Sequence, residues 1–138
     1  MKKQRVLILC TGNSARSQMA EGFLRHFGGD RYEVFSAGTH PGALRDEAVQ
    51  AMRDWEIDLS GQRAKSVDEF AGQQFDYVVT VCDNAARNCP VFPGAAERVH
   101  WSFDAPAAAV GDYRTRVTEF RRVRDEIAAR FREFFQLA

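Results

Sequence analysis

The chain has 138 residues, which is the usual size of a single domain, so we expect residues 1–138 to fold as one unit. Hydrophobic residues make up 45% and charged residues 28%, a globular composition that excludes disordered and collagen-like chains. The 19 basic residues balance the 19 acidic ones, so the formal net charge is zero. This balance argues against nucleic acid or an acidic membrane surface as a partner.

The longest early apolar run, residues 6–9, is too short for a membrane span or for the core of a signal peptide. We therefore expect a cytoplasmic protein. In that reducing compartment the three cysteines, Cys10, Cys82 and Cys89, are more typical of catalysis, metal binding or redox chemistry than of structural disulfides.

The elements predicted along the chain alternate between strands and helices. Short branched or aromatic runs bounded by turn residues indicate strands at residues 6–9, 32–37, 77–81 and 99–101. Apolar residues at helical spacing, or a capping-box pattern, indicate helices at residues 19–27, 44–55, 66–70 and 113–134. The alternation favours an α/β fold, a doubly wound parallel sheet of about four strands with helices on both faces. The ligand site is expected beyond the carboxyl ends of the strands, where Cys10 and Cys82 both lie.

A small polar loop joins the first predicted strand to the first predicted helix and places Cys10 six positions before Arg16. Such a loop directs successive backbone N–H groups inward, and the helix dipole adds partial positive charge at the same place. Gly12 allows a tight turn, and the Arg16 guanidinium can hold two oxygens at once. These features predict a site for a tetrahedral oxyanion. This oxyanion-binding loop consists of Cys10, Thr11, Gly12, Asn13, Ser14, Ala15, Arg16 and Ser17.

The same positive field stabilises a thiolate, so we predict that Cys10 is a nucleophile rather than a buried inert thiol. Ser14 and Ser17 are placed to donate hydroxyl hydrogen bonds to the sulfur. Asn13 is expected to brace the loop rather than to touch the substrate.

Cys82 and Cys89 are seven positions apart in a segment that can be helical or looped. Two intact helical turns would separate them by about 10 Å, so a disulfide between them requires local unwinding. The pair fits a redox switch that a reductant can attack, although two ordinary buried cysteines would have the same spacing. Together, the three thiols suit a two-electron reduction. One thiol forms an adduct with the substrate, a second attacks that adduct, and the third clears the resulting disulfide.

Short motifs spread along the chain carry a family resemblance. They are C-T-G-N-S-A-R-S after V-L-I-L, S-A-G at 36–38, V-V-T-V-C-D at 78–83, N-C-P at 88–90, H-W at 100–101 and F-R-R-V-R-D-E-I at 120–127. Through these motifs, nearly the whole chain resembles the thioredoxin-coupled arsenate reductases, a branch built on the low-molecular-weight protein tyrosine phosphatase fold. The combination of the anion loop with Cys82 and Cys89 is the most specific element, because the phosphatases share the loop alone.

The resemblance implies an enzyme of arsenic detoxification that reduces arsenate to arsenite. Cys10 would attack arsenate held by the loop and Arg16, and Cys82 would then attack Cys10 and release arsenite. Cys89 would next attack Cys82, which frees Cys10 and leaves a Cys82–Cys89 disulfide for thioredoxin to reduce. Thioredoxin would supply the electrons, so no metal, prosthetic group or other cofactor is expected. A weak phosphatase side activity is compatible with the same loop.

The chain departs from the family at the general acid. In the family this acid is an aspartate directly before a proline, but here the stretch is Asp104-Ala105-Pro106. Ala105 occupies the acid position, so Asp104, one residue early, is the candidate substitute acid.

A second departure concerns a monovalent-cation site of some relatives, whose ligands correspond to Asn13, Glu21 and Ser36 together with an acidic residue. Lys65 stands at the acidic position. Its ammonium group can take the place of the metal, which would make potassium unnecessary; the alternative is a solvated surface lysine.

Two other functions fit parts of the sequence. A low-molecular-weight tyrosine or small-molecule phosphatase would use Cys10 and Arg16 through a phosphocysteine but would not need Cys82 and Cys89. A zinc-binding or thiol-sensing module could combine the three cysteines with His100, but these spacings match no common structural zinc pattern. Arsenate reduction is the favoured hypothesis.

Overall fold

The structure is a computed structural model that describes residues 2–81 and 91–137. The described strands are β1 (Gln4–Cys10), β2 (Tyr32–Gly38), β3 (Phe75–Thr80) and β4 (Ala95–His100). The described α-helices are α1 (Arg16–Gly28), α2 (Asp46–Arg53) and α3 (Tyr113–Phe134), and the 3₁₀ helices are η1 (Val67–Phe70) and η2 (Pro106–Ala108). This confirms the predicted α/β fold with a four-stranded parallel sheet.

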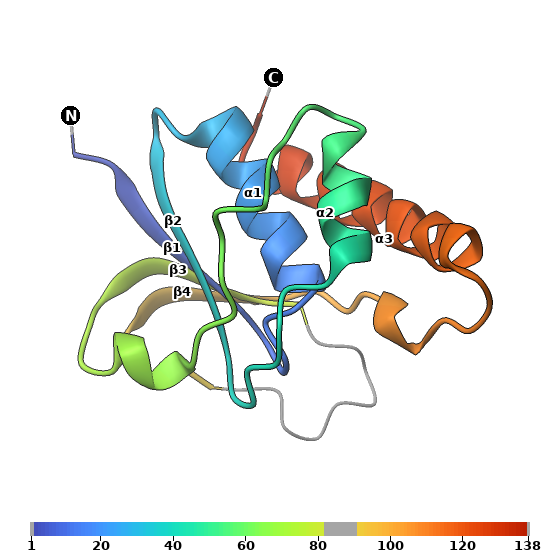
Figure 1. Cartoon of the computed structure of the whole chain (residues 1–138). Coiled ribbons are helices and arrows are strands. Elements are labelled where there is room, and N and C mark those ends of the chain that lie inside the picture. Colours follow the sequence, from blue (N-terminus) through green and yellow to red (C-terminus); the bar gives the residue numbers. More distant parts are fainter. Residues whose placement is uncertain (1, 82–90, 138) are drawn as a thin grey trace.

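The strand order in the sheet is β2-β1-β3-β4, and all neighbouring strands run parallel (Figure 1). The chain moves to one side of β1 to form β2 and to the other side to form β3, so the strand order reverses at β1. In the registered ladders Cys10 lies opposite Gly38, and Thr80 lies opposite both Leu9 and His100. The carboxyl ends of the strands therefore meet at one edge, which is where open α/β sheets bind ligands.

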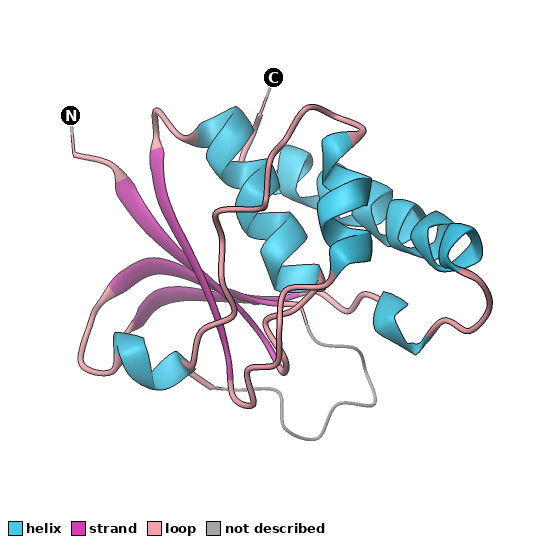
Figure 2. Ribbon diagram, viewed as in Figure 1, coloured by secondary structure: helices cyan, strands magenta, loops and turns pink. Residues whose placement is uncertain are grey.

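β1 is buried on both faces, as its continuous apolar sequence predicts. Val6 and Ile8 belong to the core cluster on the helical side, whereas Leu7 and Leu9 belong to a second cluster on the other side, and all four are fully buried. Figure 2 shows α1, α2 and α3 gathered on one face of the sheet and η1 against the other. Helices thus lie on both faces, with the three described α-helices together on one of them.

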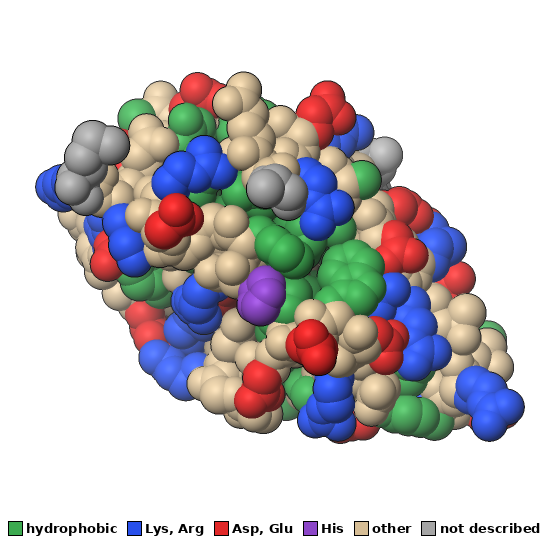
Figure 3. Space-filling view, turned by 90° about the horizontal axis from the view of Figure 1, so that it is seen from above, with side chains coloured by type: hydrophobic (Ala, Val, Ile, Leu, Met, Phe, Trp, Pro, Cys, Tyr) green, Lys and Arg blue, Asp and Glu red, His purple; other side chains and the backbone are tan. Residues whose placement is uncertain are grey.

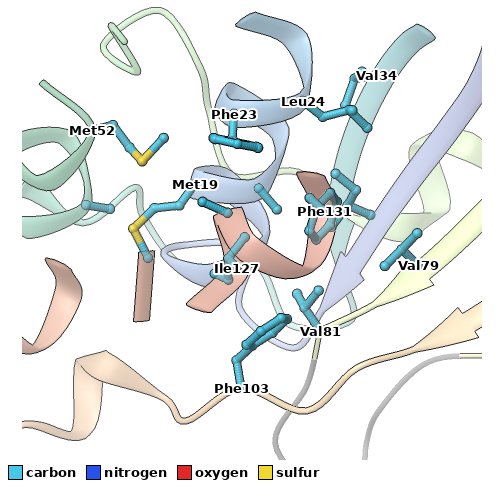
Figure 4. Close-up of a cluster of buried hydrophobic side chains, with 14 of the residues drawn as sticks. Met19, Phe23, Leu24, Val34, Met52, Val79, Val81, Phe103, Ile127 and Phe131 are labelled. Atoms are coloured by element: carbon cyan, nitrogen blue, oxygen red, sulfur yellow. The ribbon is translucent and has the colours of Figure 1, made fainter. Parts of the chain in front are cut away.

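The larger core lies between the sheet and the three α-helices (Figure 4). Met19 and Phe23 of α1 and Phe131 of α3 are at most 1% exposed, and each such side chain contributes about 1.5–3 kcal/mol of hydrophobic stabilisation. Val81 and Phe103 extend this core toward the carboxyl edge of the sheet. The chain segments around Val81 and Phe103, near the carboxyl edge of the sheet, are therefore anchored by buried apolar side chains.

β4 begins at Ala95, four residues before the strand that the sequence indicates at 99–101. Its first residues are exposed or half-buried because β4 is an edge strand, so they carry no apolar pattern that marks a strand. Pairing with β3, from Phe75 opposite Ala95 onward, defines this part of the strand instead.

The molecular surface carries acidic and basic side chains close to one another. Figure 3 shows blue and red side chains interspersed on the face seen from above, around a small apolar area. Within the described ranges, no helix combines the length and the apolarity needed to cross a bilayer.

Candidate active site

The oxyanion-binding loop runs from Cys10, the last residue of β1, to Ser17 in the first turn of α1. Cys10 is 2% exposed, and its sulfur accepts a hydrogen bond from the backbone N–H of Asn13 at 3.3 Å. The hydroxyl oxygen of Ser17 lies 2.9 Å from the same sulfur. In the described structure no side chain caps α1, so the positive end of its dipole opens into the loop. The sulfur thus lies at the amino-terminal end of α1, beside a backbone N–H and a hydroxyl group.

The segment from residue 39 to residue 45 holds the loop in shape through backbone hydrogen bonds. The N–H groups of His40, Gly42 and Arg45 donate to the carbonyl oxygens of residues 11, 12 and 14 at 2.9, 3.0 and 2.9 Å. In a trans peptide the N–H of the next residue points away from the carbonyl. The N–H groups that follow these carbonyls, including that of Asn13, are therefore turned to the inner side, where an anion would bind.

Gly38 permits the close approach of β2 to this loop. A Cβ atom at Gly38 would lie 2.4 Å from the carbonyl oxygen of Thr11 and 3.0 Å from the backbone nitrogen of Asn13. Asn13 itself has a φ of 48°, in the left-handed region that asparagine tolerates better than most residues. The loop conformation thus depends on a glycine outside it and an asparagine within it.

The side chain of Asn13 braces the loop from beneath. Its amide nitrogen donates to the hydroxyl oxygens of Ser17 at 2.8 Å and Ser36 at 2.9 Å. Its amide oxygen accepts from the backbone N–H of Lys65 at 2.8 Å and from the side chain of Gln18 at 3.1 Å. All of the amide's donor and acceptor directions are thereby used inside the protein rather than on a substrate.

Two glutamines support Asn13 and gave no signal in the sequence. The amide nitrogen of Gln18 also donates to the carbonyl oxygen of Asn13 at 2.9 Å and to that of Arg63 at 2.8 Å. Gln62 donates in turn to the side-chain oxygen of Gln18 at 2.7 Å, which fixes the orientation of that amide. Gln18 is fully buried, and its partners lie up to 45 residues away along the chain. A single sequence holds no pattern that pairs residues over such a separation.

The structure brings Lys65 together with Asn13, Glu21 and Ser36. Lys65 Nζ lies 3.7 Å from Glu21 Oε1, and the Ser36 hydroxyl donates to the same carboxylate oxygen. The side chain of Lys65 is 13% exposed, so it is not a solvated surface lysine. Burial lowers the pKa of Lys65 from its ordinary value, while the charge of Glu21 opposes this effect. Arg25 also pairs with Glu21 at 2.6 Å.

Arg16 links the loop to the segment that follows β4. Its Nη1 atom donates to the carbonyl oxygen of Phe103 at 3.2 Å, and Phe103 is itself buried in the core. The guanidinium therefore lies between the oxyanion-binding loop and residues 102–105.

Asp104 does not turn toward the loop, although it is the candidate substitute acid. Its carboxylate pairs with Arg122 of α3 at 3.0 Å, and its side chain is 76% exposed. Ala105, at the family's acid position, directly precedes η2. The role expected of Asp104 thus requires that its side chain leave Arg122.

Of the two serines expected beside the Cys10 sulfur, the described structure joins Ser17 to it by a hydrogen bond and not Ser14. Its carbonyl oxygen accepts from Arg45, as described above, while Ser17 supplies the hydroxyl beside the Cys10 sulfur. Ser14 therefore contributes to the shape of the loop, and Ser17 is the serine that contacts the nucleophile.

Cys82 and Cys89 lie outside the described residues. The other ligand considered for a zinc site, His100, has both ring nitrogens near hydroxyl groups. Nδ1 lies 2.5 Å from Thr80 Oγ1, and Nε2 lies 3.3 Å from Ser102 Oγ. Among residues 2–81 and 91–137, no group of three or more histidine, cysteine, aspartate or glutamate side chains is arranged to hold a metal ion.

A comparison of the chain with known protein families finds a match over nearly its full length. The family described as low molecular weight phosphotyrosine protein phosphatase matches residues 5–137. The chain belongs to this family. The match includes both the anion loop and the C-terminal helix, so it covers nearly the whole described fold.

Within the family, the similar proteins include arsenate reductases. An arsenate reductase of Halalkalibacterium halodurans is 46% identical over 97% of this chain and 96% of its own length. A solved structure of an arsenate reductase in the phosphate binding state is 27% identical, with a TM-score of 0.81 over 95% of both chains. The thioredoxin-dependent arsenate reductase of Corynebacterium glutamicum is 25% identical, with a TM-score of 0.70 over 97% of this chain and 61% of that one.

Proposed function

We propose that this chain reduces arsenate to arsenite through a relay of three cysteines, with thioredoxin as the reductant. The observation that supports the proposal most is the placement of Cys10 in a loop preorganised for an oxyanion, in a chain 46% identical to an arsenate reductase. The family match alone would fit a phosphatase equally well, so the assignment depends on these relatives and on the two further cysteines.

In the first step the Cys10 thiolate attacks the arsenic atom of arsenate held by the loop and Arg16. An S–As bond forms, and an arsenate oxygen leaves as water after taking up protons. The N–H groups on the inner side of the loop and the guanidinium of Arg16 offset the negative charge of the oxyanion.

The next two steps carry the electrons. The Cys82 thiolate attacks the Cys10 sulfur, an S–S bond forms, and the electron pair of the S–As bond passes to arsenic, which leaves as arsenite. Cys89 then attacks Cys82, which releases the Cys10 thiolate and leaves a Cys82–Cys89 disulfide. The thioredoxin dithiol reduces this disulfide and thereby supplies the two electrons that arsenate consumed.

No redox cofactor is required in this scheme because thiols carry both electrons. We also propose that Lys65 serves as an internal cation beside Glu21 and the loop brace Asn13, so that potassium is not needed. The reducing cytoplasm, where thioredoxin keeps thiols reduced, is the compartment that fits such a relay.

Hydrolysis of phosphate monoesters through phospho-Cys10 is the second candidate. The family assignment favours it, because the family is described as one of phosphotyrosine protein phosphatases. In this reaction Cys82 and Cys89 would have no chemical role.

Arsenate-dependent NADPH oxidation in the presence of thioredoxin and thioredoxin reductase tests the proposal. Hydrolysis of 4-nitrophenyl phosphate by the same preparation runs beside it. We expect arsenate turnover that is lost in Cys10→Ser, Cys82→Ser and Cys89→Ser, together with slow phosphate release that only Cys10→Ser abolishes. Fast phosphate release without arsenate-dependent oxidation would replace the proposal with the phosphatase alternative.

A further inference from the structure

Asp104 directly follows the residue whose carbonyl oxygen accepts a hydrogen bond from Arg16 of the loop. Arg16 Nη1 donates to the carbonyl oxygen of Phe103 at 3.2 Å, and Asp104 is the next residue. From standard backbone dimensions, the Cα atom of Asp104 therefore lies within about 6 Å of that guanidinium nitrogen. A carboxylate at this position can reach an oxyanion bound by Arg16 once its side chain rotates toward the loop.

Arg122 of α3 holds the Asp104 side chain in another direction. Its Nη2 atom donates to Asp104 Oδ2 at 3.0 Å. The same guanidinium also pairs with Glu119 at 2.9 Å and with Glu126, so three carboxylates share one positive charge. These hydrogen bonds raise the pKa of Arg122 from its ordinary value, so the positive charge is present at every working pH.

The two candidate reactions of the loop need a proton donor to different degrees. A phosphate monoester must expel an alkoxide or phenoxide, which leaves slowly unless an acid protonates it. Arsenate loses only one of its own oxygens, which exchange readily with water. The position of an acid beside the loop therefore controls ester hydrolysis far more than arsenate reduction.

We propose that Arg122 is a specificity-determining positioning residue, which withholds the Asp104 carboxylate from the oxyanion-binding loop and so suppresses hydrolysis of phosphate monoesters. The inference rests on the proposed function, because it explains how a loop shared with phosphatases is kept for oxyanion reduction. The contact is solvent-exposed, so Arg122 shifts the preferred position of Asp104 rather than locking it. Loss of Arg122 would also leave Asp104 beside Glu119 and Glu126, whose negative charges repel it from α3.

The suppressed reaction is hydrolysis of a phosphate monoester, with Cys10 as the nucleophile and Asp104 as the acid and then the base. Cys10 attacks phosphorus, an S–P bond forms, the P–O bond to the leaving group breaks, and the carboxylic acid of Asp104 protonates the departing oxygen. Water then attacks the phosphocysteine while the Asp104 carboxylate takes a proton from that water, and the S–P bond breaks. The products are an alcohol or phenol, inorganic phosphate and the regenerated thiolate.

The test compares two aryl phosphates whose leaving groups differ in basicity. Phenyl phosphate releases phenol, whose pKa of about 10 makes protonation important, whereas 4-nitrophenyl phosphate releases a much weaker base. The variants are Arg122→Ala, Arg122→Lys, and Arg122→Ala combined with Asp104→Asn. Arg121→Ala is the matched control, because Arg121 lies next to Arg122 on α3 but pairs with Asp54 at 2.6 Å.

We expect Arg122→Ala to raise kcat/KM for phenyl phosphate about two- to fivefold, because the loss of an exposed ion pair increases the share of Asp104 side chains free to turn to the loop by about that factor. The gain in kcat/KM is smaller for 4-nitrophenyl phosphate, whose leaving group depends less on protonation. Arg122→Lys and Arg121→Ala keep the low rate of the starting protein, and adding Asp104→Asn removes the gain.

A gain that persists in the double variant, or that is equal for both esters, overturns the proposal, since Asp104 would then not deliver the proton. An unchanged rate in a folded Arg122→Ala variant also overturns it. Arsenate-dependent NADPH oxidation is measured for the same proteins. If the unaltered protein shows no arsenate-dependent NADPH oxidation, the proposed function is overturned. The rates of phosphate-ester hydrolysis still test the role of Arg122 in that case.

Discussion

The side-chain amide of Asn13 donates to the hydroxyl oxygen of Ser17 across 2.8 Å. The direction is fixed because the other end of this amide accepts the backbone N–H of Lys65, which can only donate. With its oxygen accepting from Asn13, Ser17 has its own proton left for the Cys10 sulfur at 2.9 Å. The sulfur therefore accepts hydrogen bonds from both Ser17 and the backbone of Asn13, which is the pattern that a thiolate requires.

Replacing this donor tests its contribution to the nucleophile. A hydrogen bond to a charged group contributes about 1.5–3 kcal/mol, so Ser17→Ala should lower kcat/KM for arsenate by about 10- to 100-fold. Coupled turnover measures the rate, and Ser60→Ala, at an exposed serine, is the matched control. An unchanged rate in folded Ser17→Ala would show that the hydroxyl does not support the thiolate.

Lys65 should make arsenate turnover independent of the monovalent cation. Its ammonium group lies 3.7 Å from Glu21 Oε1, where we propose that it supplies the positive charge that a bound potassium ion would supply. We expect equal rates in sodium and potassium salts of the same ionic strength, and a gain of potassium dependence in Lys65→Asp. Lys3→Asp, at an exposed lysine, controls for the change in net charge. Strong potassium stimulation of the unaltered protein would eliminate the internal cation.

Restoring an acid at residue 105 should separate the two reactions of the loop. Ala105→Asp places a carboxylic acid at the family's position, and positioned acids contribute about 10²- to 10⁴-fold. We expect faster hydrolysis of aryl phosphates with arsenate turnover changed about twofold at most, since arsenate needs no strong proton donor. Ala105→Asn is the uncharged control. If Ala105→Asp accelerates neither reaction, the missing acid does not limit the phosphatase reaction.

Glu47 should make folding stability depend on acid pH. Burial would raise its pKa, but hydrogen bonds from Arg45, its own backbone N–H and Arg116 outweigh burial and lower the pKa to about 2. Because the pKa is lower than the ordinary 4.5, the stabilisation is complete above pH 4.5 and is lost as the pH falls toward 2. The full effect is about 3 kcal/mol in the free energy of unfolding.

Urea unfolding at pH 6, 4 and 3 measures this effect in the starting protein and in Glu47→Gln. The variant should be less stable at pH 6 and should lose less stability on acidification. Asp46→Asn removes a neighbouring exposed carboxylate of α2 as the control. Parallel pH curves for the starting protein and Glu47→Gln would contradict the assignment.

The oxyanion-binding loop could be predicted because its parts are contiguous in the sequence. A buried strand ends at Cys10 and a helix begins at Arg16, so the sequence itself brings the N–H groups and the guanidinium to one strand-to-helix junction. The strands with continuous apolar runs, β1 and β3, were equally accessible from the sequence. Local patterns were sufficient where each element carries its own signal.

The supports of the site could not be predicted because they pair residues distant in the chain. Gln62 contacts Gln18 across 44 positions, and neither polar residue reveals the other. Asp104 could be identified as the nearest carboxylate to the acid position, but its pairing with Arg122 follows from the packing of α3 beside residues 102–105. Both pairings depend on tertiary contacts, which a local sequence pattern does not show.

A single turnover without thioredoxin tests the central claim most directly. Fully reduced protein is mixed anaerobically with one equivalent of arsenate, arsenite is quantified, and the disulfides are mapped by peptide mass spectrometry. The three-cysteine relay predicts one arsenite per protein molecule, a Cys82–Cys89 disulfide and a free Cys10 thiol. A protein that stays fully reduced, or arsenite formed without a Cys82–Cys89 disulfide, would contradict the relay.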